Sequence, residues 1–98
     1  MPLYRVVEAP EASALRASGG LPTPSPTGQE SKPFFKTLEQ AIRYQEQVDA
    51  LFGPTQIWRF ANPVGVGEEG PPVDTVPGPT WHVPNNDLAR LSHGERVN

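Results

Sequence analysis

The stretch that decides the fold is residues 32–44, KPFFKTLEQAIRY. Its first half is short and aromatic, which is typical of a strand that needs a partner strand to be stable. Thr37, with a glutamine three residues later, fits a helix capping box. Apolar residues then recur at helical spacing until a Gly-Pro pair ends the pattern. We therefore predict a strand at residues 34–35 and an amphipathic helix over residues 38–52.

Further strands and short helices flank this unit. Residues 3–8 (LYRVVE), 55–61 (TQIWRFA) and 80–83 (TWHV) have the length and the β-branched or aromatic content of strands. Residues 11–18 follow a proline and precede Gly-Gly, so they predict a short helix. A last helix is expected at residues 88–91, with the preceding Asn-Asn-Asp as its N-cap. The fold class predicted is α+β: a small split or mixed sheet of about four or more short strands with two to three helices.

Proline and glycine set the organisation of the rest of the chain. With 98 residues, 13 of them Pro and 9 Gly, we expect a single domain, residues 1–98, with a thin core. Residues 21–31 form a Pro-rich loop and residues 62–79 a Gly/Pro-rich loop in this interpretation. The polar residues from Ser92 onward are expected to fray.

Composition excludes several classes of protein. There is no cysteine, so neither a disulfide framework nor a thiolate nucleophile is available. The net charge of −3 and scattered basic residues make nucleic-acid binding an unfavourable interpretation. His82 and His93 are the only imidazoles and have no second ligand at metal spacing, so no metal site is predicted. The absence of a long apolar run or a readable signal segment predicts a cytoplasmic protein without membrane contact, unless a specialised system exports it.

Short motifs follow one another in a recognisable order along residues 3–91. They are Tyr4-Arg5, Gly20-Leu21-Pro22, Lys32-Pro33-Phe34-Phe35 with Thr37, Ala41-Ile42-Arg43-Tyr44, Phe52-Gly53-Pro54 and, at residues 81–88, WHVPNNDL. This order resembles that of small bacterial ADP-ribosyltransferase-like toxin domains. The resemblance implies an ADP-ribosyltransferase-like fold and an enzyme, such as a toxin effector or a mobile-element protein, that uses NAD to modify a macromolecular target.

The resemblance also implies a site in a cleft between two small sheets. Its contacts with NAD would come from Arg5, Tyr4, Phe34, Phe35, Tyr44 and His82. Arg5 would reach phosphate or ribose through its guanidinium fork. One Phe would stack on nicotinamide, Tyr44 would close a wall, and Thr37 would take the place of the family's Ser or Thr beside the ribose.

A carboxylate is needed to stabilise the oxocarbenium-like charge that develops on the ribose. In the family it lies on or next to a late strand, but the late strand here, residues 80–83, contains no acid. Glu69 is the first candidate and Asp74 the second, whereas Asp87 fits a helix cap better. With neither near Arg5, the chain would be a relative that binds a ligand or partner without turning it over.

Ordinary structural roles would explain the same residues. Arg5 could be a salt-bridge partner, the two Phe residues could be core, and Thr37 could be only an N-cap. Tyr44 would then be a helix-face residue, and His82 a packed strand residue.

The alternative function is a non-catalytic module that binds a cognate protein. Trp58, Trp81 and the Pro-rich loops would supply its contact surface. A weaker variant makes residues 23–26, TPSP, a segment that another domain recognises in extended conformation.

Overall fold

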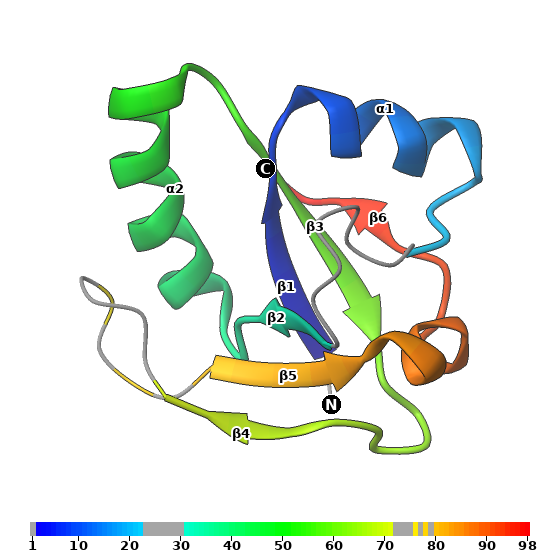
Figure 1. Cartoon of the computed structure of the whole chain (residues 1–98). Helices are drawn as coiled ribbons and strands as arrows, with labels where there is room; N and C mark the ends of the chain where they lie inside the picture. Colours follow the sequence, from blue (N-terminus) through cyan, green and yellow to red (C-terminus); the bar gives the residue numbers. More distant parts are fainter. Residues whose placement is uncertain (1, 23–30, 72–75, 77, 79) are drawn as a thin grey trace.

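The computed structural model describes residues 2–22, 31–71, 76, 78 and 80–98 (Figure 1). In the first of two three-stranded sheets, β1 (Pro2–Val7) and β6 (Glu95–Arg96) flank β3 (Gln56–Ala61), with all pairs antiparallel. The predicted strands at 3–8 and 55–61 are confirmed to within a residue. The expectation of a frayed tail is wrong, because the tail pairs through its main chain: the Val97 amide donates to the Ile57 carbonyl at 2.8 Å. Such pairing does not require apolar side chains.

The second sheet has the order β2–β5–β4, again antiparallel. Here β2 is Ser31–Phe34, β5 is Thr80–Pro84 and β4 is Glu68–Gly70. The interpretation of residues 62–79 as loop throughout is therefore wrong at β4. Asn62 closes the turn before β4 by bonding both the amide and the carbonyl of Val66, and the Trp81 indole donates to the same carbonyl at 2.8 Å.

The two sheets meet at an antiparallel bridge between Tyr4 and Phe35. The Tyr4 amide donates to the Phe35 carbonyl at 2.8 Å, and the Phe35 amide donates to the Tyr4 carbonyl at 2.6 Å. The α+β fold with a split sheet is thus confirmed.

Helix α2 (Leu38–Phe52) has the bounds that the sequence predicts. Thr37 caps it, since its hydroxyl accepts from the Gln40 amide at 3.2 Å, and Gly53 ends it with φ +88°. Helix α1 (Ala9–Ala17) begins two residues earlier than predicted. The last helix, η1 (Asn85–Arg90), is a 3₁₀ helix that starts at Asn85, with no side-chain cap, so the Asn-Asn-Asp N-cap is wrong.

The core consists of two clusters on opposite faces of the β1–β3 pair. One face carries Leu3, Val7, Trp58 and Phe60, which pack with α1, the second sheet and the segment from η1 to Leu91. The other face carries Ile57, which packs with Ala41 of α2 and with Phe35. In Figure 1, α2 accordingly lies to one side of β1 and β3, and α1 to the other. In the described residues, no helix is both long and apolar enough to cross a membrane.

Candidate ligand pocket at the junction of the two sheets

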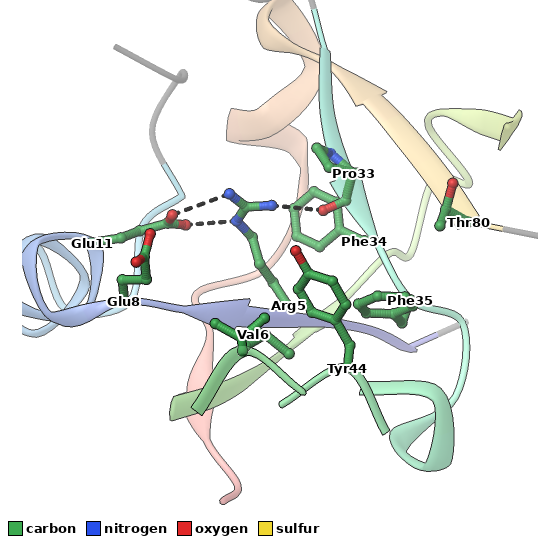
Figure 2. A pocket seen from close by; sticks show the side chains of 10 residues that line it. Arg5, Val6, Glu8, Glu11, Pro33, Phe34, Phe35, Tyr44 and Thr80 are labelled. Atoms are coloured by element: carbon green, nitrogen blue, oxygen red, sulfur yellow. Dashed lines mark hydrogen bonds and ion pairs between the residues drawn. The ribbon is translucent and has the colours of Figure 1, made fainter. Parts of the chain in front are cut away.

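A pocket of about 350 Å³ opens where the free edge of β1 faces β2 and α2. It is lined by Arg5, Val6, Glu8, Glu11, Pro33, Phe34, Phe35, Tyr44, Val48 and Thr80 (Figure 2). Its volume falls in the lower part of the range of small-molecule sites, roughly 300–1,000 Å³. The pocket therefore has room for a nucleoside-sized group.

Arg5 is held in place by three hydrogen bonds. Its Nε and Nη2 donate to the two carboxylate oxygens of Glu11 at 2.7 and 3.1 Å, and its Nη1 donates to the Pro33 carbonyl at 2.8 Å (Figure 2). Both side chains of the ion pair are mostly shielded from water, with exposures of 19% and 25%. A guanidinium has five N–H donors. Two of them have no acceptor among the described residues and remain for a ligand.

Phe34 and Phe35 line the pocket and also belong to the core. The Arg5 guanidinium carbon lies 5.9 Å from the centre of the Phe34 ring, which packs edge-on against Phe60 at 5.6 Å. Phe34 is 1% exposed and Phe35 is 6% exposed. Both residues are therefore core residues and also form part of the pocket wall.

Tyr44 reaches the pocket from α2. Its ring packs against Phe35 at a centroid distance of 5.4 Å. Its hydroxyl points toward the side of the pocket that holds the Arg5 guanidinium (Figure 2) and makes no hydrogen bond within the described part of the chain. This hydroxyl can therefore donate to, or accept from, a ligand.

The main chain of Val6 adds a donor and an acceptor at the same pocket. Hydrogen-bonding directions alternate along a strand. Since the amide and carbonyl of Tyr4 point away from β3 toward Phe35, those of Val6 point away from β3 as well. No described strand pairs with Val6 on that side.

Other predicted site residues lie elsewhere. Thr37 is the α2 cap. Glu69 pairs with Lys36 at 2.9 Å, and this lysine lies over the Trp81 ring. Neither Thr37 nor Glu69 lines the pocket. Asp74 is outside the described residues.

Tyr4 and His82 also do not line the pocket. Tyr4 packs against the α2-side cluster. His82 is bonded to the Thr80 hydroxyl through Nε2 at 2.8 Å. Because that hydroxyl donates to the Pro71 carbonyl, it must accept from a protonated Nε2. His82 therefore positions Thr80, which does line the pocket.

Sequence reasoning missed two carboxylates that line the pocket, Glu8 and Glu11. Glu11 lies in the first turn of α1, where an acid is already explained by the helix dipole. The signal that could have found it is the alternation of β1: Arg5 shares a face with Leu3 and Val7, the face that α1 covers. Among the described residues, no group of three or more His, Cys, Asp or Glu is placed to hold a metal ion.

The contact surface expected for a binding module also differs in the structure. Trp58 is only 6% exposed and packs in the core, so it offers no surface anchor. Trp81 is half-buried. The TPSP segment lies outside the described residues.

Comparisons with protein-family models, with curated proteins and with solved structures found no match to this chain.

Proposed function

We propose that this protein is an ADP-ribosyltransferase-like enzyme whose pocket binds the nicotinamide and ribose of NAD, and that it modifies a protein target in the cytoplasm. One observation carries the proposal. Four of the residues that the resemblance assigns to NAD line a single pocket, although they come from three separate segments of the sequence: Arg5, Phe34, Phe35 and Tyr44.

The chemistry of the pocket matches the half of NAD that consists of nicotinamide and its ribose. The aromatic side chains offer an apolar wall to the nicotinamide ring. The outward amide and carbonyl of Val6 complement a carboxamide, which both accepts and donates hydrogen bonds. The two free N–H groups of Arg5 suit a ribose hydroxyl or a phosphate oxygen. With a volume of about 350 Å³, the pocket takes nicotinamide and ribose, while the adenosine end extends outside it.

The proposed reaction breaks the bond between ribose C1′ and the nicotinamide nitrogen. Nicotinamide leaves with the bonding electron pair, so positive charge develops on the ribose. A nucleophile of the target then bonds to C1′ and gives up its proton. A carboxylate beside the ribose stabilises the developing charge in the transition state. We assign this role to Glu11, which lies in the pocket wall and is held by Arg5.

Binding is tested by thermal unfolding in the presence of NAD. A ligand at one hundred times its Kd stabilises the native state by about 2.7 kcal/mol, which raises the Tm of a domain of this size by roughly 10–20 °C. Nicotinamide alone should give a smaller rise. Tyr44→Ala, which removes part of the pocket wall, should reduce the NAD shift. Arg43→Gln, on the exposed side of the same helix, should not. The absence of any shift with either ligand would refute the proposal.

Transfer is tested by labelling a lysate with NAD that carries a tag on its adenosine. Glu11→Gln should abolish labelling, because the carboxylate acts on charge that exists mainly in the transition state. Most of the NAD-induced Tm shift should remain, because the aromatic wall and the bond from Arg5 to the Pro33 carbonyl are kept. Glu39→Gln, an exposed acid on α2, is the matched control and should label normally. Full labelling by Glu11→Gln would remove Glu11 from the mechanism. If the wild-type protein binds NAD but produces no labelling in lysates, the protein is a binder and not an enzyme.

A further inference from the structure

A second hollow, of about 170 Å³, lies between α1, the start of β3 and β6. Arg16 of α1 and Arg96 of β6 both line it, together with Gln56 and Ala9. None of the described residues that line the first pocket lines this one. The second hollow is therefore separate from the pocket proposed for NAD.

The two arginines differ from the other basic residues of the chain. Every other basic side chain that the structure describes has an acidic partner: Arg5 with Glu11, Lys36 with Glu69, Arg43 with Glu39, Arg59 with Glu95 and Arg90 with Asp87. Arg16 and Arg96 form no ion pair with any described residue. In a protein with 11 acids and 8 bases, the two guanidinium groups that have no acidic partner among the described residues thus line the same small hollow.

Neutral groups around the hollow add further donors. The Gln56 side-chain oxygen accepts from the Trp58 indole at 3.0 Å, so its NH₂ group is left to donate. Ala9 places the first turn of α1 at the hollow, and this end of a helix carries partial positive charge. Within the part of the chain that the structure describes, the hollow is lined by no acidic residue.

We propose that this hollow binds a single phosphate group, either free or at the end of a small molecule. Guanidinium forks match phosphate oxygens in bidentate geometry, and two of them neutralise a dianion. A water molecule occupies about 30 Å³ in the liquid, so 170 Å³ holds roughly five to six waters. That space fits one phosphate group with some of its water but not a nucleotide.

The two tryptophan indoles provide a reporter and an internal control. In ¹H–¹⁵N spectra, inorganic phosphate added at constant ionic strength should shift the Trp58 indole signal in a saturable way. The Trp58 indole donates to the Gln56 side-chain oxygen, so a phosphate bonded to the NH₂ group of Gln56 changes that hydrogen bond. The Trp81 indole, bonded to the Val66 carbonyl, should not move. A parallel titration with glycerol phosphate distinguishes a free phosphate from a terminal one, since the preferred form binds more tightly.

Variants test whether Arg16 and Arg96 bind the phosphate. The Arg16→Gln/Arg96→Gln double variant should bind phosphate at least about tenfold more weakly, since it loses two charge-assisted contacts. Arg43→Gln should bind as the wild type does. Saturable Trp58 shifts that persist in the double variant would overturn the proposal. The same holds if neither phosphate compound gives a saturable shift, or if sodium chloride alone reproduces it.

Discussion

The ion pair between Arg5 and Glu11 should contribute far more to stability than the surface pairs of this protein, and a double-mutant cycle measures the difference. Arg5→Met keeps the apolar stem of the side chain over Phe34, and Glu11→Gln keeps the size of the acid. The lost bond from Arg5 to the Pro33 carbonyl is common to both Arg5→Met proteins, so it cancels in the cycle.

The expected coupling follows from the geometry. Opposite charges about 3 Å apart attract by roughly 5 kcal/mol at an effective dielectric constant of 20. Desolvation and side-chain ordering offset part of this attraction. Two charge-assisted hydrogen bonds between side chains that are 19% and 25% exposed should leave a net coupling of about 2 kcal/mol. The pair Arg43–Glu39, with 3.5 Å between its charged atoms and exposures of 54% and 80%, should give about 0.3–0.5 kcal/mol.

Urea unfolding of the four proteins of each cycle, at low ionic strength, gives both couplings. Salt screens exposed charges more than buried ones, so added salt should reduce the control coupling proportionally more. A coupling for Arg5–Glu11 no larger than that for Arg43–Glu39 would show that water screens the pair. The statement that the hydrogen bonds to Glu11 hold Arg5 in place in the pocket would then be refuted.

Two further predictions concern backbone and capping. Gly20→Ala should destabilise the fold by about 2 kcal/mol or more, because Gly20 has φ +90° and an added Cβ would overlap the Gly94 carbonyl. Gly19→Ala, at a position with φ +72° and no atom within 4 Å of an added Cβ, should lower the free energy of unfolding by only about 1 kcal/mol. Equal losses for the two variants in urea unfolding would contradict the overlap between residue 20 and Gly94. Thr37→Ala should lower stability by about 1 kcal/mol, and Thr37→Asp should restore it with NAD-dependent labelling intact, since the hydroxyl caps α2. Labelling lost in the folded Thr37→Asp protein would instead give Thr37 a role beside the ribose.

The sequence predicts those elements whose local signals agree with their packing. Helix α2 has a capping box, a helical apolar repeat and a Gly-Pro end, and its predicted bounds are the observed ones. Strands β4 and β6 carry no such signal, because their sequences, Glu-Glu-Gly and Glu-Arg, disfavour strands. They form because β5 and β3 present unpaired edges to them, and that tertiary effect is not visible in a short window of sequence.

The residues of the candidate site, too, can be predicted only in part from the sequence. The motif order leads to Arg5 and the aromatic residues, which do line one pocket. It does not lead to Glu11, because the pairing of Arg5 with Glu11 depends on how α1 folds back over β1. The position of Glu69 before the late strand makes it the first candidate in the sequence, but Lys36, two residues after β2, pairs with it at the surface instead.

A single proline explains why a pocket exists at this junction. If the antiparallel bridge between Tyr4 and Phe35 continued, Val6 would lie opposite Pro33. Pro33 has no amide hydrogen to donate, so the ladder stops and the edge of β1 at Val6 stays open. The Pro33 carbonyl, which points toward β1, accepts from Arg5 instead and so fixes the guanidinium beside that open edge. The split between the two sheets and the placement of the charged group thus have the same cause, which ties the candidate site to the fold itself.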